Sequence, residues 1–452
     1  MKYFVKDLEK ILNAKKINLV DNKEITGIAI DSRKVKEGDL FIPFLGENVD
    51  GHDYIESAFE KGAVASLSLK DDFKSGNNII YVNDSYEAIQ TLAKHYLECL
   101  NVKIVAITGS NGKTTTKDIV TSILETKFKV HKTQGNFNNE LGVPLTILAA
   151  PEDSDILVLE MGADNFGQLD FLSKLVKPDY TIITNIGESH IEFFGSRAGI
   201  AKAKFEITNG MKKDGFFVYN GDELLLKELV ENSSINATSC GENSYNDIIL
   251  ENYTITRDKI DFKLNIDKNS FSTTLKGKHN LFNLMFAVAI AKKIGLANEE
   301  IRHAIDNISK ITNMRLESIP YGEDSLIIND AYNASPTSMK AAVDVISDLN
   351  DFEFKTLVLG SMFELGPNEV EYHSGIGTYI NNNSRGINLV ISVGALAKNI
   401  TDNINNKDIN TLHFSTVEEV TDYLKANKHK NEVILFKASR SMKLETIIND
   451  IK

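Results

Sequence analysis

Apolar runs and helical stretches alternate along the middle of the chain. Apolar and β-branched residues fill positions 103–108 ("KIVAIT"), 155–162 ("DILVLEMG") and 180–187 ("YTIITNIG"), and segments with helical spacing separate these runs. Near-continuous apolar strands of this kind are typical of a parallel sheet that helices cover on both faces. Residues 251–267 alternate polar and apolar positions instead, which predicts an antiparallel edge. The pattern therefore predicts a mixed, mostly parallel sheet.

The same α/β pattern continues on both sides of this region. Residues 1–16 carry apolar residues at helical spacing, and a second helix is expected at 87–100 after short strands at 25–30 and 39–44. Four further apolar runs stand near the end of the chain, at 325–332, 355–362, 388–394 and 432–439. They predict a second parallel sheet of the dinucleotide-binding kind, although no G-x-G-x-x-G fingerprint accompanies it.

The chain is too long for a single core. At roughly 150 residues per domain, 452 residues predict about three domains. The changes of pattern place their limits at 1–99, 100–313 and 314–452. We expect an α/β protein with a small N-terminal α/β domain, a central domain with a mostly parallel sheet and a C-terminal Rossmann-like α/β domain.

Composition and charge narrow the possible partners. A formal net charge of -13, without any Lys/Arg run, disfavours nucleic acid and anionic membrane surfaces. The longest apolar stretch, residues 281–291, is well short of the roughly 20 residues that span a bilayer. Charges interrupt residues 1–16, which therefore lack the apolar core of a secretion signal. With two cysteines and no metal-ligand spacing around them, we expect a reduced, cytoplasmic setting and no membrane insertion.

One strand of the central region runs into a glycine-bearing turn and then a helix. "VAITGSNGKTTTKD" (105–118) is similar to a phosphate-binding loop, but it is two residues shorter than G-x-x-x-x-G-K-[ST], whose first glycine would fall at Ile107. A purely structural turn is the alternative. At the start of a helix, unpaired N–H groups favour an anion, Lys113 can reach terminal phosphates and Thr114 can ligate Mg²⁺. We therefore predict a nucleotide site formed by Gly109, Ser110, Asn111, Gly112, Lys113, Thr114 and Thr115.

Two further polar residues follow apolar strands. Glu160 ends the strand "DILVLE", at the edge where open α/β sheets bind ligands, and it would supply a hard oxygen ligand for Mg²⁺. His190 follows the next strand along the chain, after a turn glycine. A solvated strand-end acid and a structural histidine are the alternatives. Lys202 and Lys204 lie near the start of a helix, and their spacing alone assigns a function to neither.

Several motifs carry a family resemblance, in order along the chain. They are "TGSNGKTTT", "GNFNNELGVPLTIL", "LEMGADNFGQLDFL", "TNIGESHIEFFGSRAGIAKAKFEI", "GKHNLFNLMFAVAIA" and "INDAYNASPTSMKAA". The chain resembles the Mur ligases, which add amino acids to the nucleotide-linked peptidoglycan precursor, over essentially its whole length. "DAYNASP" (330–336) and "FELG" (363–366) are similar to the branch that adds D-alanyl-D-alanine to UDP-N-acetylmuramoyl-tripeptide.

The resemblance implies a UDP-sugar domain, a central P-loop ATPase and a C-terminal domain for the incoming amine. ATP would convert the terminal carboxylate of the tripeptide into an acyl phosphate, which the amine of D-alanyl-D-alanine then attacks. Because the reacting groups are anionic, cations must gather around them. Lys113 and two Mg²⁺ ions would supply this charge, one ion on Thr114 and Glu160 and the second on Glu160 and His190.

The resemblance also assigns further residues. Lys204 would carry the carbamate that many members use as a metal ligand, with Lys202 as the second candidate. Asn280 would face adenine, while Arg315 and Asp330 would lie near the phosphates and ribose, so that closure of the third domain completes the ATP site. The expected substrate contacts are Ser32 and Arg33 for UDP, Asn136, Asn138 and Asn139 beside the sugar or its phosphates, and Asn333, Ser335 and Arg440 for the dipeptide.

Two positions depart from the family pattern, and two other functions compete with it. Ser361 stands where the family usually has the acid of "GDM", and Ala438 where it has the glycine of "KGSR", which leaves details of the amine site open.

A folate-specific glutamate ligase shares the short loop, but "DSR" (31–33) and "DAYNASP" disfavour it. A non-enzymatic nucleotide-gated protein would be expected to lack Lys113, Glu160 or His190. We expect a monomeric enzyme.

Overall fold

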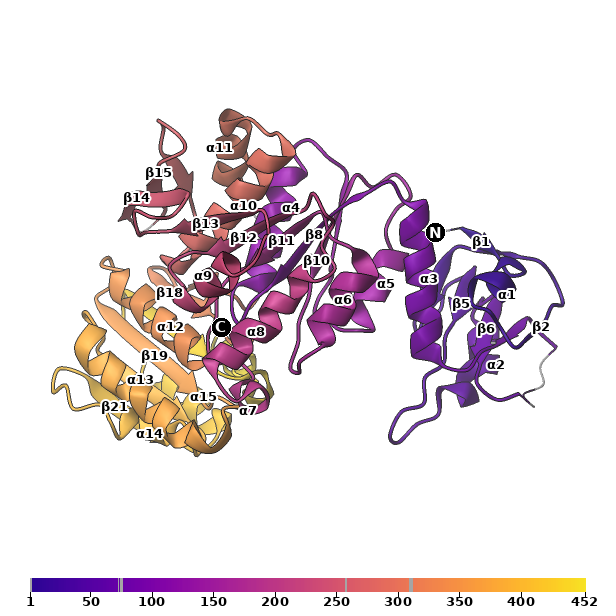
Figure 1. The fold of residues 1–452 in the computed structure, drawn as a ribbon. Coiled ribbons are helices and arrows are strands. Elements are labelled where there is room, and N and C mark those ends of the chain that lie inside the picture. Colours follow the sequence, from indigo (N-terminus) through magenta and orange to yellow (C-terminus); the bar gives the residue numbers. More distant parts are fainter. Residues whose placement is uncertain (1, 72, 74–75, 257, 309–311) are drawn as a thin grey trace.

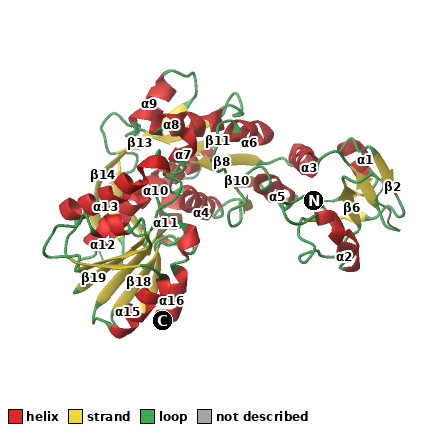
Figure 2. Cartoon of the chain, turned by 90° about the horizontal axis from the view of Figure 1, so that it is seen from below, coloured by secondary structure: helices red, strands yellow, loops and turns green. Residues whose placement is uncertain are grey.

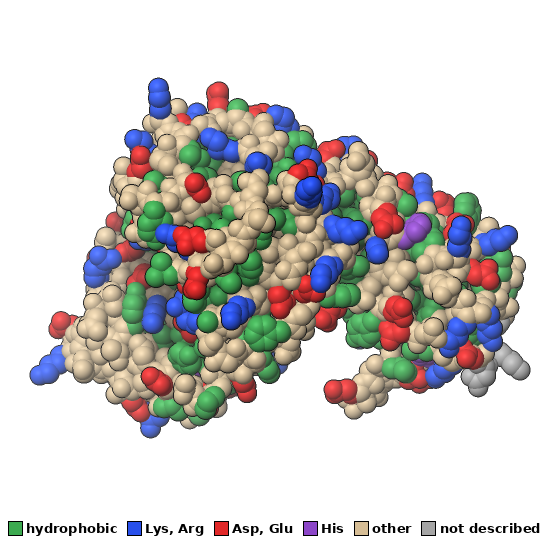
Figure 3. Space-filling view, in the orientation of Figure 1, with side chains coloured by type: hydrophobic (Ala, Val, Ile, Leu, Met, Phe, Trp, Pro, Cys, Tyr) green, Lys and Arg blue, Asp and Glu red, His purple; other side chains and the backbone are tan. Residues whose placement is uncertain are grey.

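The computed structural model describes residues 2–71, 73, 76–256, 258–308 and 312–452. The described chain forms three α/β domains along its length, and the predicted fold class is confirmed (Figure 1). The N-terminal domain stands to one side and contacts the central domain where α3 (Ser85–Cys99) packs against α5 (Gly142–Leu148) (Figures 1 and 2). Below this joint a notch separates the N-terminal domain from the rest of the molecule (Figure 3). The C-terminal domain lies against the central one (Figure 1).

The N-terminal domain is built on a five-stranded sheet of order β2-β7-β6-β5-β4. The expected helix at 1–16 is wrong over most of its length, because β1 (Tyr3–Phe4) pairs with β3 (Glu24–Ile25) and only α1 (Asp7–Ile11) is helical. Asn13, at φ 47°, ends this helix. The other elements are β2 (Lys16–Asn18), β4 (Gly27–Ala29), β5 (Asp39–Phe41), a 3-10 turn (Gly51–Tyr54), α2 (Ile55–Glu60), β6 (Ala65–Ser68) and β7 (Ile79–Tyr81).

The central sheet has the order β16-β15-β14-β13-β12-β11-β8-β10-β9. It is parallel from β9 to β14, and β15 and β16 add the predicted antiparallel edge. Its strands are β8 (Lys103–Thr108), β9 (Val130–Lys132), β10 (Ile156–Glu160), β11 (Tyr180–Ile183), β12 (Phe216–Asn220), β13 (Ala237–Gly241), β14 (Ile248–Ile255), β15 (Ile260–Leu264) and β16 (Phe271–Thr273). Its further helices are α4 (Lys113–Leu124), α6 (Gln168–Val176), α7 (Ile191–Phe194), α8 (Arg197–Phe205), α9 (Leu224–Glu231), α10 (His279–Ile294) and α11 (Asn298–Asp306).

Helices cover both faces of this sheet, as the apolar strands predict. In β8, Ile104 and Ala106 belong to the core shared with α5 and α6, while Val105 and Ile107 belong to the core shared with α4 and α10. Successive side chains of a strand point to opposite faces, so a strand buried on both faces has to be apolar throughout. This double burial fixes the end of β8, from which the loop at 109–112 projects.

The C-terminal sheet has the order β17-β18-β22-β19-β20-β21, with β17 antiparallel and the other five strands parallel. Its strands are β17 (Glu317–Tyr321), β18 (Ser325–Asn329), β19 (Phe354–Gly360), β20 (Leu389–Val393), β21 (Asn410–Phe414) and β22 (Glu432–Lys437). Its helices are α12 (Pro336–Asp348), α13 (Glu369–Asn383), α14 (Lys398–Thr401), α15 (Val417–Ala426) and α16 (Glu445–Ile451). Among the described helices of all three domains, none has the length and apolar character needed to cross a bilayer.

Candidate active site

The loop between β8 and α4 is held by the segment that follows β11. Gly109 has φ +146°, and a Cβ there would collide with the Thr184 hydroxyl, while Gly112 has φ +80°. Both positions therefore require glycine. The N–H of Ser110 donates to the Asn185 carbonyl (3.0 Å), and the N–H of Asn111 donates to Asn185 Oδ1 (2.9 Å). These contacts fix the loop at the carboxyl edge of the sheet.

Lys113 begins α4 and folds back over the loop. Its ammonium donates to the carbonyls of Gly109 (2.8 Å) and Ser110 (3.3 Å). Burial lowers the pKa of Lys113; the charge of Glu160 opposes this shift and that of Arg315 adds to it. A half-buried ammonium held by neutral carbonyls is stabilised further by an anion, so the loop and the start of α4 suit a phosphate group.

Glu160 lies directly beside the loop because β10 pairs in parallel with β8, with Glu160 opposite Ile107. Asn138 Nδ2 donates to Glu160 Oε1 (2.9 Å), while the buried Oε2 has no hydrogen-bond partner among the described residues. Buried acceptors are normally hydrogen-bonded, so this oxygen is available to a ligand. Since Mg²⁺ prefers carboxylate, hydroxyl and phosphate oxygens, Glu160 and Thr114 suit this ion. Over the described ranges, no three His, Cys, Asp or Glu side chains gather into a ready-made metal site.

His190 follows β11 and faces the C-terminal domain. Its backbone lies in the left-handed region at φ 59°, and its Nδ1 is 2.6 Å from Glu364 Oε2. Burial lowers the pKa of His190; Glu364 opposes this shift, and the charges of Lys113 and Lys204 add to it. A neutral imidazole is the form that binds a metal ion.

The two lysines of α8 differ in their surroundings. Lys202 is exposed, whereas Lys204 is buried, donates to the Ala163 carbonyl (2.9 Å) and lies 5.4 Å from the ring centre of Phe194. Burial, reinforced by the charge of Lys113, lowers the pKa of Lys204 to about 7. Near neutral pH a large fraction of this amine is therefore uncharged and nucleophilic, which favours Lys204 over Lys202 as the carbamate candidate.

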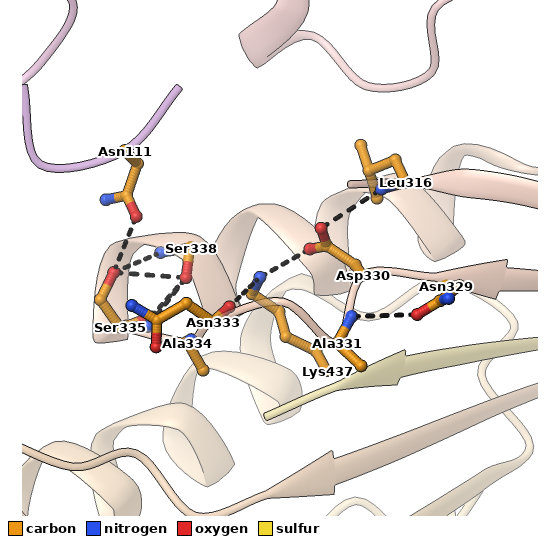
Figure 4. A network of polar contacts seen from close by, with 10 residues as sticks. All are labelled: Asn111, Leu316, Asn329, Asp330, Ala331, Asn333, Ala334, Ser335, Ser338 and Lys437. Carbon is orange, nitrogen blue, oxygen red and sulfur yellow. Dashed lines mark hydrogen bonds and ion pairs between the residues drawn. The ribbon is translucent and has the colours of Figure 1, made fainter. Parts of the chain in front are cut away.

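The C-terminal domain brings a second group of polar residues to the loop (Figure 4). β18 and β22 are neighbours, so Asp330 and Lys437 meet at the carboxyl edge of their sheet, where Lys437 Nζ is 2.6 Å from Asp330 Oδ2. Ser335 caps α12 and donates to Asn111 Oδ1 (3.2 Å), while the Thr337 hydroxyl donates to Glu188 Oε2 (2.6 Å). The start of α12 thus rests on the phosphate loop of the central domain.

A cavity of about 610 Å³ lies between the central and C-terminal domains. Most of the predicted residues converge on it: Ser110, Asn111, Gly112, Lys113, Thr114, Thr115, Asn138, Glu160, His190, Asn280, Arg315, Asp330 and Asn333. Arg315 lies with its guanidinium carbon 4.3 Å from the ring centre of Tyr332, and its buried Nε has no partner among the described residues. The cavity therefore carries cations and unpaired polar groups from two domains.

A second cavity of about 420 Å³ adjoins the first. His190, Tyr332 and Asn333 line both cavities, and the predicted Ser335 and Arg440 line the second. Ser361 and Ala438 line neither. Ser361 accepts from the N–H of Ala397 (3.3 Å), and the methyl group of Ala438 packs over Gly360, where a Cβ would lie 2.6 Å away. Both departures from the family pattern thus lie behind the cavity wall.

Other predicted residues lie outside both cavities. Gly109 contributes its carbonyl to Lys113, and Lys204 lies behind the wall. In the N-terminal domain the Ser32 carbonyl accepts from Lys61 (3.0 Å), and the exposed Arg33 pairs with Asp31 (2.8 Å). The structure does not bring Ser32, Arg33, Asn136 or Asn139 to the cavities. Asn139 instead accepts from the N–H of Gly142 (2.9 Å) at the start of α5.

Sequence reasoning missed several residues that shape the site. Asn283 lies one turn after Asn280 on α10, donates to Asn280 Oδ1 (2.8 Å) and accepts from Thr116. The i, i+3 spacing in "NLFN" was an available signal. His279 lines the cavity with its side chain open to that space, and loss of solvation there lowers its pKa to about 4, so it is neutral. The others are Asn185, Glu188, Glu364 and Lys437, and their contacts join segments far apart in the sequence.

Fold and site together define a class: three-domain phosphate-loop proteins in which the third domain completes the nucleotide cavity. Residues 24–98 match "Mur ligase family, catalytic domain", residues 107–291 match "Mur ligase middle domain" and residues 314–440 match "Mur ligase, glutamate ligase domain". The chain belongs to the Mur ligase family.

Individual relatives show which members of the family the chain is similar to. The UDP-N-acetylmuramoyl-tripeptide--D-alanyl-D-alanine ligase of Bacillus subtilis is 43% identical over 437 residues, which cover 94% of this chain and 93% of the relative. A crystal structure of MurF from Acinetobacter baumannii superimposes with a TM-score of 0.90 at 27% identity, covering 100% and 99% of the two chains. MurF from Thermotoga maritima in complex with ADP gives a TM-score of 0.83 at 29% identity, covering 94% and 96%.

Proposed function

We propose that this chain is an ATP-dependent ligase that joins D-alanyl-D-alanine to the terminal carboxylate of UDP-N-acetylmuramoyl-tripeptide, releasing ADP and phosphate. One observation carries the proposal: a single cavity holds Lys113 and Glu160 of the central domain together with Arg315 and Asp330 of the C-terminal domain. The name of the B. subtilis relative and the ADP complex of the T. maritima relative support the same reaction.

The chain's own groups fit the first half-reaction. A carboxylate is a weak nucleophile toward an anionic phosphate, so cations have to offset the repulsion. The Lys113 ammonium can exchange its loop carbonyls for phosphate oxygens, and Arg315 presents an unpaired N–H from the opposite domain. Asn138 fixes Glu160 through Oε1 and leaves Oε2 for Mg²⁺, which would neutralise developing phosphate charge when bound. Thr114 and His190 are the further candidate ligands of Mg²⁺ in this cavity.

Lys204 extends this cation chemistry. Its amine, with a pKa of about 7, is buried and reactive toward CO₂, and a carbamate there would exchange a buried positive charge for oxygen ligands. The exposed Lys202 has no comparable setting. We therefore keep Lys204 as the carbamate candidate.

An acyl phosphate has to be protected from water before the amine arrives. The contacts of Ser335 with Asn111 and of Thr337 with Glu188 hold α12 over the loop and exclude solvent from this side. The second cavity, which shares its wall with the first, is the proposed place of the dipeptide, with Asn333, Ser335 and Arg440 as contacts.

The remaining assignments extend to the whole chain. We assign residues 1–99 to the UDP-sugar, 100–313 to ATP and 314–452 to the amine, in a cytoplasmic monomer. Ser32 and Arg33 are the proposed UDP contacts, and Asn136 and Asn139 are the proposed contacts of the sugar or its phosphates. The nucleotide-sugar would extend from the N-terminal domain toward the loop, across the notch in Figure 3.

Release of phosphate from ATP tests the proposal. The purified chain is incubated with ATP and Mg²⁺, with UDP-N-acetylmuramoyl-tripeptide and D-alanyl-D-alanine added separately and together, and the peptide product is identified by mass spectrometry. We expect sustained release and a pentapeptide product only with both substrates. Equal release without the dipeptide, or release without the new amide, would refute it. Tripeptides carrying lysine or diaminopimelate at the third position show which precursor is used.

A further inference from the structure

The turn after β19 holds one acidic side chain in an unusual backbone conformation. Glu364 has φ 61°, in the left-handed region that non-glycine residues rarely adopt. Contacts on both sides hold the turn: the N–H of Met362 donates to His373 Nε2 (2.9 Å), and the N–H of Phe363 donates to Ser439 Oγ (3.1 Å). Leu365 is buried in the core. Strain that persists under such constraints is typical of functional sites.

This turn aims the Glu364 side chain across the domain boundary. Its Oε2 lies 2.6 Å from Nδ1 of His190, and half of the side chain is exposed. Among the described residues that line the second cavity, Glu364 is the one carboxylate, and Arg440 is the one residue with a permanent positive charge. The other lining groups are mostly hydroxyls, an amide and apolar side chains. The lining of the cavity therefore offers one negative and one positive group, and the positive group is shared with Glu445, which lies outside the lining.

We propose that Glu364 recognises the ammonium group of the amine substrate and holds it beside the shared wall of the two cavities. The proposal rests on the function proposed above. A dipeptide is a zwitterion, and Arg440 and Glu364 are complementary to its two ends. A carboxylate has about four acceptor sites, so the contact with His190 leaves acceptors for the three N–H donors of an ammonium.

The position of Glu364 also explains the direction in which the dipeptide lies. His190 lines both cavities, so the group that Glu364 holds lies next to the cavity with Lys113 and Glu160. Arg440 pairs with Glu445 at the start of α16 (2.9 Å). The carboxylate end of the dipeptide, bound to Arg440, would therefore point into the C-terminal domain. The amine end therefore faces the acyl group and the carboxylate end faces away from it.

The test combines a substitution with a change in the ligand. Glu364→Gln keeps the shape and removes the charge, and N-acetyl-D-alanyl-D-alanine lacks the ammonium. In the wild type we expect the acetylated dipeptide to inhibit with a Ki about 10- to 100-fold above the KM of the free dipeptide, the range expected for one hydrogen bond to a charged group. In E364Q the KM of the free dipeptide should rise by this factor, while the Ki of the acetylated dipeptide and the KM values of ATP and tripeptide stay within twofold.

Two further variants complete the design. Glu371→Gln removes an exposed acid on α13, outside both cavities, and should leave all constants unchanged. Glu364→Asp keeps the charge and should restore part of the affinity for the free dipeptide, and melting temperatures check that each variant is folded.

Several results would overturn the assignment. An unchanged dipeptide KM in E364Q, or equal weakening of the free and acetylated dipeptides, would show that Glu364 acts only through His190 or the turn. A lower kcat in E364Q at an unchanged dipeptide KM would likewise show that Glu364 does not bind the ammonium. The wild type separates the two proposals: without dipeptide-dependent phosphate release the ligase function fails, whereas normal release with an unaltered preference in E364Q removes only the role of Glu364.

Discussion

A buried carboxylate links the phosphate-loop helix to the last residues of the central domain, just before the C-terminal domain begins. Asp118 lies on α4, where its Oδ2 accepts from both the N–H (2.9 Å) and the hydroxyl (2.6 Å) of Thr312. Its Oδ1 accepts from Lys132 (2.8 Å), and the Lys117 ammonium is 3.5 Å away. Asp118→Asn keeps the size of the side chain but removes its charge and turns one acceptor into a donor. We predict that this change destabilises the central domain.

The size of the effect follows from the burial of the pair. Removing one partner of a buried ion pair costs about 3–5 kcal/mol. Lys132 is partly exposed and can turn to water, so we take the lower end, about 3 kcal/mol. For a domain of about 200 residues this corresponds to a fall in Tm of roughly 6–12 °C.

The stabilisation should also depend on pH. Burial raises the pKa of Asp118, but the charge of Lys117 and the hydrogen bonds from Lys132 and Thr312 outweigh it, so the pKa lies below its usual range. The contribution is therefore present above the ordinary aspartate pKa of about 3.9 and is lost as the pH falls below it. The difference between wild type and D118N should shrink in acid.

Differential scanning calorimetry measures both effects. The control is Asp153→Asn, which breaks the exposed pair with Lys129 (2.6 Å) and should leave Tm nearly unchanged. If D118N melts at the same temperature as D153N near pH 7, or if the loss grows in acid, the reasoning about the buried pair is wrong.

Three further predictions concern the site. Lys113→Ala should lower kcat at least about 10³-fold while Tm is kept or raised, because a partly desolvated charge disappears. A wild-type rate in this variant would exclude the proposed role. Lys204→Ala should lose activity, and short carboxylates should partly restore it. A ¹³C carbamate signal from labelled bicarbonate should be present in Lys202→Ala and absent in Lys204→Ala, and in the wild type it should be stronger at pH 8 than at pH 6, because the pKa of Lys204 is about 7. A signal that persists in Lys204→Ala would assign the carbamate to another residue. Ala438→Gly should cost about 1 kcal/mol in chemical denaturation and leave the dipeptide KM within twofold, since this residue lies behind the wall; a larger change in KM would place Ala438 in the amine site.

The sequence predicted the fold well wherever burial was uniform. The strand at 103–108 coincides with β8 because apolar residues on both faces leave no other solution, and the alternation at 251–267 produced the antiparallel edge. It failed at the N-terminus, where residues 1–16 have a helical spacing but Tyr3–Phe4 pair with a distant strand and only Asp7–Ile11 are helical. Local periodicity carries no information about a strand partner that lies about 20 residues further along the chain.

The site could be predicted where motifs lie at the ends of strands. Lys113 and Glu160 were found because parallel strands bring their carboxyl ends to one edge. Asn185, Lys437 and Glu364 were missed because their meaning comes from contacts across more than 70 residues, such as Asn185 with Asn111 and Glu364 with His190. The structure reveals them through the contact of Asn185 with the loop, the register of β18 with β22 and the positive φ of Glu364.

The wall that the two cavities share has a consequence for inhibitor design. Tyr332 and Asn333 border both spaces, so a molecule that fills one cavity ends within reach of the other. Two weak fragments joined across this wall would bind as one, with an avidity about 10²- to 10⁴-fold beyond either fragment if the linker fits the span. A phosphate mimic on the loop side and a zwitterionic group on the Arg440 side would suit the opposite ends of such a molecule.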